Sequence, residues 1–350
     1  MRMSRGVLLA LAATLQVACG GGGGDSSGGG GNNPPPPPPP PPPTGDTITS
    51  TNGMAVATAV VTTTTFVQDL GLPDAAGPFV PAGVTVRPAS ANSSLAVGIG
   101  GAVRRGVEAI SKIESRLAIA ACEPEDPDCT AVQCTLGGDI TITATLADDS
   151  TLTPGDVVSV VYNSCAEADG TLNGGVNLTV TTVDGDPNVP PFSADLDVAI
   201  DSVALTHEGT TVSANGALGA TISSEAEGTL TLALAGTELA TVLDDDTITL
   251  QDFTSTESDD FNAGQYTLDV AGTIASDVQG SYAFETPTTL TGAGGEFPSA
   301  GEILIHGADD TSARITALDN TNVRLELDTD GDGEPDESSD TTWTDLTDGT

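Results

Sequence analysis

The sequence predicts a mainly β fold: a large antiparallel meander that forms a curved sheet, a barrel or a sandwich, preceded by one amphipathic helix and a disordered tether. Three observations predict it. From Cys134 onward, apolar residues alternate with Thr, Asp and Ala in a period of two. Clusters of Gly, Asn and Asp separate these segments, as turns do. Apolar residues recur at helical spacing between Ser94 and Ala121.

Residues 1–18 have the parts of a secretory signal peptide. Arg2 and Arg5 supply the positive start, and an apolar run follows from Val7 to Leu15. This run is shorter than the about 20 residues that a helix needs to cross a bilayer. We therefore expect a signal peptide that directs export.

The sequence LQVACG at 15–20 ends this signal. It resembles the lipobox of bacterial lipoproteins, although Gln16 stands where that family usually has an aliphatic residue. The resemblance implies cleavage before Cys19 and lipid on its thiol, and Gly20 after the cysteine implies sorting to the outer membrane. More than one acyl chain gives stable anchoring. The alternative is an ordinary cleavable signal with a chance cysteine.

Residues 19–45 have the composition of a tether. Gly20 to Asn33 is nearly all Gly, Ser and Asn, which form a flexible coil. Ten consecutive prolines from Pro34 to Pro43 form a stiff polyproline II rod, roughly 31 Å long at 3.1 Å per residue. We expect a spacer between lipid and body. The alternative, a ligand for a proline-recognition domain, lacks flanking basic residues.

Residues 46–121 read as a poorly ordered segment with a helix near 94–121. Within it, Thr62 to Phe66 has the composition of an edge strand. This helix can lie on a membrane surface, or it can pack on the sheet with its positive side toward the acidic body. We favour the second alternative, because the acidic residues of the same chain supply a partner for the basic side of the helix. Its apolar positions are Val103, Val107, Ile110, Ile113 and Leu117, and its basic ones are Arg104, Arg105, Lys112 and Arg116.

Residues 122–350 form the predicted acidic antiparallel β domain. The alternation predicts about ten to twelve strands and no further helix. One face of each strand is apolar and the other carries Thr and Asp. The clearest apolar sets are Leu196, Val198 and Ile200; Leu230, Leu232 and Leu234; Tyr266, Leu268 and Val270; and Val323, Leu325 and Leu327.

The charge balance excludes some partners. The chain has 50 Asp and Glu against 9 Lys and Arg, a net charge of −41. After Ala121, Arg314 and Arg324 are the only basic residues. Such a body repels nucleic acid and anionic lipid surfaces, so neither is an expected partner of the body. Solubility is the simplest explanation of the acid.

Four cysteines remain besides Cys19, and an exported chain permits disulfides. They allow three pairings, and their spacing is not that of paired CxxC zinc knuckles, although metal binding stays an alternative. We favour one bridge that closes an acidic loop and one that ties a strand to a later strand. These are Cys122–Cys129 and Cys134–Cys165.

The region from 134 to 174 carries a second resemblance. Its segments are CTLGG at 134–138, LTPGD at 152–156, YNSC at 162–165 and LNG at 172–174. This layout resembles uncharacterised proteobacterial outer-membrane lipoproteins. The resemblance supports the Cys134–Cys165 bridge and implies no activity.

The sequence DTDGDGEPD at 328–336 is the most specific chemical signal. It places Asp328, Asp330, Asp332 and Asp336 at positions 1, 3, 5 and 9 of a loop, which suits a hard cation with six to eight oxygen ligands. It resembles the calcium loops of thrombospondin type 3 repeats, EF-hands and dockerins. Ser339 stands where an EF-hand has a bidentate Glu, so we expect weak calcium binding. The alternative is a solvated acidic turn.

Signals for an enzyme are few. His207 and His306 each fall where a strand meets a turn, and the chain lacks a nucleophile elbow, a zinc-type His pair and a phosphate-binding loop. We expect a non-catalytic, lipid-anchored cell-envelope module, either structural or binding an unknown protein or small ligand. The alternatives are an apolar-ligand carrier with a barrel lumen and a carboxylate-based hydrolase. A filled core, a cavity of several hundred Å³ or a cleft with two carboxylates would distinguish the three.

Overall fold

The computed structural model describes residues 45–71, 99, 131–148, 152–167, 170–186, 189–207, 209–243 and 246–348. The signal peptide, Cys19, the tether, Cys122 and Cys129 lie outside these residues. So does the helix predicted near 94–121, apart from Ile99, which is helical and buried.

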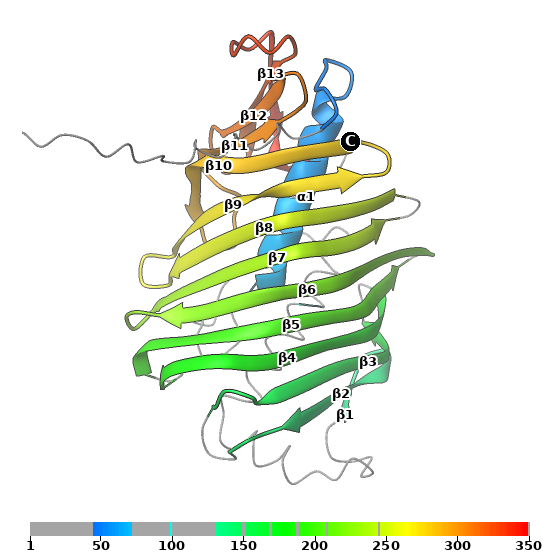
Figure 1. Cartoon of the computed structure of the whole chain (residues 1–350), viewed down its shortest axis with the longest axis vertical. Helices are drawn as coiled ribbons and strands as arrows, with labels where there is room; N and C mark the ends of the chain where they lie inside the picture. Colours follow the sequence, from blue (N-terminus) through cyan, green and yellow to red (C-terminus); the bar gives the residue numbers. More distant parts are fainter. Residues whose placement is uncertain are drawn as a thin grey trace, which may run out of the picture. The chain divides into compact units, whose positions relative to one another are not determined.

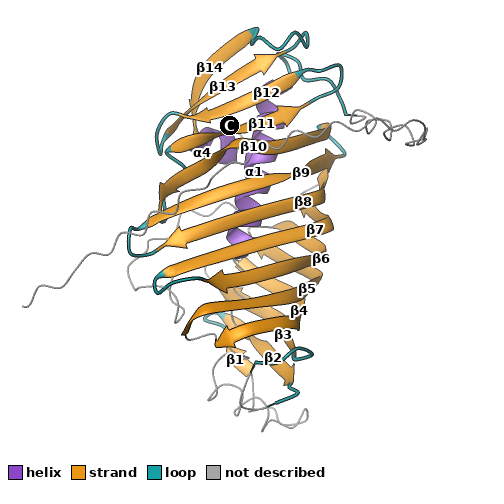
Figure 2. Cartoon of the chain, turned by 60° about the vertical axis from the view of Figure 1, so that its left-hand side comes forward, coloured by secondary structure: helices purple, strands orange, loops and turns teal. Residues whose placement is uncertain are grey.

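The described strands form one antiparallel sheet of 14 strands, and each strand pairs with the next along the chain. Figures 1 and 2 show this meander running in sequence order from β1 to β14. β1 and β14 are its two edges, so the sheet is open. The predicted antiparallel meander is confirmed as a single open sheet, and it has more strands than the ten to twelve expected.

The longest strands lie in the middle of the sheet. The strands are β1 Ala131–Gln133, β2 Gly137–Thr145, β3 Val157–Glu167, β4 Gly170–Asp186, β5 Val189–His207, β6 Thr210–Ser224, β7 Thr229–Leu243, β8 Asp246–Asp260, β9 Gln265–Ser276, β10 Gly280–Ala293, β11 Ala300–His306, β12 Ser312–Ala317, β13 Asn322–Asp328 and β14 Glu337–Thr342. The two helices are α1 Gly53–Gly71 and α4 Trp343–Asp348.

One face of the sheet is buried and the other is wet, as the alternation predicts. On β5, Leu196 and Val198 are buried, whereas Asp197 between them is exposed. We call the buried side the inner face and the other the outer face. Each fully buried Val or Leu contributes roughly 1.5–3 kcal/mol through loss of apolar surface to water, so this one face supplies most of the stabilisation of the sheet.

Helix α1 shows that the edge strand predicted at 62–66 is wrong. Helix α4 likewise contradicts the expectation that residues 122–350 contain no further helix. Helix α1 is the longer of the two. It lies on the inner face, where it contacts β8, β12, β13 and α4 (Figures 1 and 2). Val56, Val60 and Phe66 are buried beneath it, and even Thr63 and Thr64 are buried. Burial nearly all round the helix leaves no polar stripe, so helical periodicity was not visible in the sequence. Neither α1 nor α4 has both the length and the apolar character of a helix that crosses a membrane.

Residues 46–48 are fixed to the sheet just before α1. Asp46 donates its N–H to the carbonyl of Ser281 (3.2 Å) and accepts from the N–H of Ala308 (3.0 Å). The N–H of Ile48 donates to the buried hydroxyl of Thr311 at 2.9 Å. The chain therefore enters the fold beside the start of β10 and the loop between β11 and β12.

Candidate functional site

The loop between β13 and β14 brings carboxylates together at one end of the sheet. Its base is closed by the N–H of Asp336, which donates to the carbonyl of Leu327 at 2.8 Å. Carboxylate oxygens of Asp328, Asp330 and Asp332 all lie within 4.8 Å of one another. Three of the four predicted calcium ligands therefore meet.

Asp328 organises this loop. Asp328 is only 6% exposed. Its two carboxylate oxygens accept hydrogen bonds from the N–H groups of Gly331 (2.8 Å) and Gly333 (2.9 Å). Both glycines have left-handed backbone angles, with φ of 74° and 87°, which glycine adopts without steric cost. The glycines of the motif thus fold the backbone around the first carboxylate.

Asp336, the fourth predicted ligand, has a different partner. Its carboxylate accepts from the N–H of Thr329 at 2.8 Å and from the Thr329 hydroxyl at 2.7 Å. These bonds favour the ionised form and lower the pKa of Asp336. Asp336 closes the loop and lies outside the group of three.

A neighbouring acidic loop lies against this one. Asp309 and Asp310, between β11 and β12, have φ of 54° and 60°. A Cβ at Gly331 would lie 2.4 Å from the carbonyl oxygen of Asp309, so the two loops touch at a position that excludes any side chain. The sequence motif does not indicate this contact, because the two loops come together only when β12 pairs with β13.

The donor chemistry of Asp328, Asp330 and Asp332 fits a hard divalent cation. Calcium binds carboxylate and carbonyl oxygens at 2.3–2.6 Å and takes six to eight of them. Each oxygen of Asp328 has one lone pair left after its backbone hydrogen bond. Three carboxylates leave the remaining positions to backbone carbonyls and water, which is the composition of a weak site.

The structure has the predicted disulfide between Cys134 and Cys165, with Cα atoms 5.4 Å apart. Cys134 lies in the turn between β1 and β2, and Cys165 lies in β3. Glu167 is nearby, but sulfurs joined to each other supply no thiolates to a metal. The joined sulfurs therefore favour the bridge over the metal alternative for this pair.

The two histidines occupy strand ends, as predicted. His207 ends β5 and is exposed. His306 ends β11, where its Nε2 lies 3.3 Å from Oε1 of Glu285, and both side chains are about half exposed, at 42% and 55%. An exposed pair of this kind contributes little to stability.

Two carboxylates on the inner face were not singled out by the sequence. Glu257 and Asp259 occupy inward positions of β8. Glu257 pairs with Leu232 and Leu268 on the neighbouring strands, and Asp259 pairs with Leu230 and Tyr266. Glu257 accepts from Nε2 of Gln68 in α1 at 3.2 Å. Burial raises the pKa of Asp259 from 3.8 to about 6. The available signal was the loss of apolar alternation at the end of β8.

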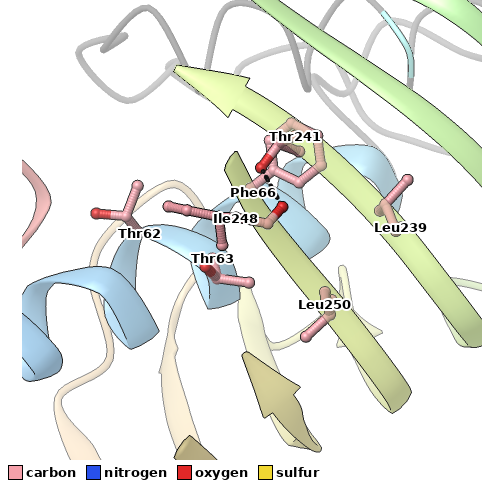
Figure 3. Close-up of a pocket in the computed structure, with 7 residues that line it drawn as sticks. All are labelled: Thr62, Thr63, Phe66, Leu239, Thr241, Ile248 and Leu250. Carbon is pink, nitrogen blue, oxygen red and sulfur yellow. Dashed lines mark hydrogen bonds between the residues drawn. The ribbon is translucent and has the colours of Figure 1, made fainter. Parts of the chain in front are cut away.

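A pocket between α1 and the sheet bears on the carrier alternative (Figure 3). The pocket is lined by Phe66 of α1, by Leu239 of β7 and by Ile248 and Leu250 of β8, and three threonines complete the lining. Its volume is about 20 Å³, which is room for about one water molecule. Apolar ligand sites measure several hundred Å³, so α1 and the sheet fill this part of the inner face.

Comparison with known protein families, with curated proteins and with solved structures finds no match.

Proposed function

We propose that this chain is a non-catalytic lipoprotein of the cell envelope, anchored by lipid on Cys19 to the outer membrane and facing the periplasm or the cell surface. Its β body acts as a structural or partner-binding module. The observation that carries this proposal is the fixed entry point of the chain, because Asp46 and Ile48 are hydrogen-bonded to the sheet directly after the Gly/Pro-rich segment. A tether that leads directly into a folded body is suited to act as a spacer between the lipid anchor and the β body.

The Cys134–Cys165 disulfide supports export. Disulfides persist in the periplasm and at cell surfaces and are rare in a reducing cytosol. The bridge therefore agrees with the signal peptide predicted at 1–18.

The filled space beneath α1 supports a structural or binding module over a carrier. The water-sized pocket lined by Phe66 and Leu239 offers no room for an apolar ligand. The outer face, in contrast, is polar and accessible along β5 to β8. Binding to another molecule is thus better suited to the outer face.

Calcium is the proposed cofactor of the module. The grouping of Asp328, Asp330 and Asp332 supports a weak site that stiffens the β13–β14 hairpin. The role of the ion is structural, because the loop lies at the edge of the sheet.

The anchor is tested by the change Cys19→Ser in the native host. The mutant should move from the membrane fraction to the soluble fraction, since it lacks the acylated thiol. Cys129→Ser, which removes a different thiol, should remain with the membrane and serves as the control. A Cys19→Ser protein that stays as membrane-bound as the parent after a high-pH wash would disprove the lipid anchor.

A further inference from the structure

The strands β5, β6, β7 and β8 lie side by side in the sheet (Figure 1). The outer face is hollowed across these four strands. The hollow has a volume of about 280 Å³ and is open to solvent on one side. Its floor is shallow because Gly219, Ala233 and Ala235 place no atom beyond Cβ above the sheet. We call it the outer groove.

The strand register builds the groove from two parallel rows of cross-strand neighbours. Each row begins with a carboxylate on β5, crosses small residues on β6 and β7, and reaches a threonine on β8. The rows are Asp195, Thr221, Ala233 and Thr256, and Asp197, Gly219, Ala235 and Thr254. In the first row, Thr256 pairs with Asp269 on β9, so a carboxylate lies at both ends of that row.

One of the two carboxylates of β5 that line the groove, Asp195, is held in place and kept ionised. Asp195 accepts hydrogen bonds from the hydroxyls of Thr182 and Thr221, the latter at 2.6 Å. These bonds lower the pKa of Asp195. A carboxylate has about four acceptor positions, so Asp195 can still accept from a further donor.

The cations of the described chain lie elsewhere. Arg314 is on β12, and Arg324 on β13 is paired with Asp340 at 2.9 Å. Neither strand contributes to the groove. An apolar floor with anionic ends is complementary to a group that has a flat or aliphatic body and a positive charge.

We propose that the outer groove is a docking site for an arginine side chain on an exposed basic segment of a partner protein. A guanidinium would lie on the Ala and Gly floor and donate to Asp197 and Asp195. Arginine suits the site because its planar group packs flat and forms charge-assisted hydrogen bonds with carboxylates.

Two physical arguments select a protein over other cationic ligands. Small-molecule sites bury most of the surface of their ligand, whereas this groove is shallow and covers one side only. An arginine anchor needs little cover because the rest of its protein excludes water around it. The inference rests on the proposed partner-binding function and deepens it by naming the site and the chemistry of the partner. Docking here requires neither the lipid on Cys19 nor calcium, so the test below is separate from the test of the anchor.

The test uses the full-length protein in mild detergent with EDTA, and a fluorescent Gly/Ser peptide that carries four arginines as the probe. The same peptide with four glutamines gives the background. Asp197→Asn should weaken the dissociation constant about two- to fivefold, as loss of one exposed charge does. Ala235→Leu, which fills the exposed floor, should weaken it about tenfold. Asp201→Asn removes another exposed carboxylate of β5 outside the groove, and should change binding less than twofold.

Each outcome decides the question. Weaker binding with Asp197→Asn and Ala235→Leu, but not with Asp201→Asn, supports the docking site. Equal weakening by both Asn variants would show only general attraction to an acidic protein, and an unchanged Ala235→Leu would show that the groove is not used; either result overturns the proposal. Competition by arginine amide at the same concentration as the peptide would point to a small amine and would overturn a protein partner.

Discussion

Asp259 shows how one residue on the inner face sets a pH dependence. It lies between Leu230 of β7 and Tyr266 of β9, and burial raises its pKa from 3.8 to about 6. A folded-state pKa above the unfolded value means that the charged form destabilises the fold. The cost is absent below about pH 4 and complete above about pH 6, so this residue reduces stability as the pH rises through that window.

We predict that Asp259→Asn raises the free energy of unfolding at pH 8 by at most about 3 kcal/mol, from a pKa difference of about two units at 1.36 kcal/mol each. At pH 3.5 the change should be small, because the folded carboxyl then holds its proton and the unfolded one is mostly protonated. Denaturant unfolding at the two pH values measures the effect. Asp201→Asn, at an exposed position of β5, should show no such difference, and equal effects of Asp259→Asn at both pH values would refute the assignment.

The β13–β14 hairpin is the element on which calcium should act. A ligand that binds only the folded state stabilises it by RT ln(1 + [Ca]/Kd). With a Kd in the weak range of about 10⁻⁴–10⁻³ M, 10 mM calcium should add about 1.4–2.7 kcal/mol. Thermal unfolding in EDTA, in calcium and in magnesium measures this gain.

The loop variant Asp330→Asn with Asp332→Asn should lose the calcium-specific gain. The neighbouring loop supplies a matched control, since Asp309→Asn with Asp310→Asn removes the same charge and asparagine tolerates their left-handed φ. If calcium and magnesium act alike, or if the two double variants respond equally, the loop is only an acidic turn.

The Cys134–Cys165 bridge links the turn before β2 to β3 near one edge of the sheet. Its removal by a double change to serine should cost about 2–4 kcal/mol, because the unfolded chain regains the freedom that the closed loop denies it. Denaturant unfolding under oxidising conditions gives the value. Non-reducing peptide mapping of the parent should join these two cysteines, and a Cys129–Cys134 peptide would contradict the structure.

Among the secondary-structure elements, the sequence predicted those that the local pattern of apolar and polar residues determines. The strands followed from alternation such as Leu196, Val198 and Ile200, which requires only that one face be buried. Helix α1 did not follow, because the run from Thr62 to Thr65 is β-branched and favours strands locally. Tertiary contacts of the helix with β8, β12, β13 and α4 outweigh that preference.

The candidate site likewise has one part that the local sequence predicts and another that depends on the tertiary structure. The spacing of Asp328, Asp330 and Asp332 determines that they meet in one loop, and this was predictable. The bond from Thr329 to Asp336 was not, because a side chain can choose between a cation and a local donor. The outer groove depends on the register of four strands, which no local pattern reveals.

In the molecule as a whole, exposed acidic side chains lie on the outer face of the sheet, where water screens their charges. The net charge is −41, and Asp197 and Asp201 of β5 are exposed on the outer face. Among the described residues, Arg324 is paired with Asp340, but few cations are present to pair with the rest. Like charges at this density repel one another in the folded state and less so in the expanded one.

We therefore predict that salt stabilises the protein. The Debye length falls from about 30 Å at 0.01 M to about 10 Å at 0.1 M and 3 Å at 1 M. The melting temperature should rise steeply up to roughly 0.15 M sodium chloride, because the repulsion between distant carboxylates is screened over this range. It should then level off, because carboxylates on neighbouring strands are only about 4.8 Å apart and the remaining repulsion between them is screened only at much higher salt. EDTA in every sample keeps calcium out of the comparison.

A triple variant, Asp195→Asn, Asp197→Asn and Asp201→Asn, removes three charges from one strand and should show a smaller rise with salt than the parent. Sodium sulfate at equal ionic strength separates screening from salting-out, since exclusion from the surface strengthens burial without regard to charge. A melting temperature that is flat in dilute chloride, or that rises equally in parent and variant, would show that ordinary burial on the inner face dominates. In that case the acidic outer face would affect solubility and partner choice without measurably straining the fold.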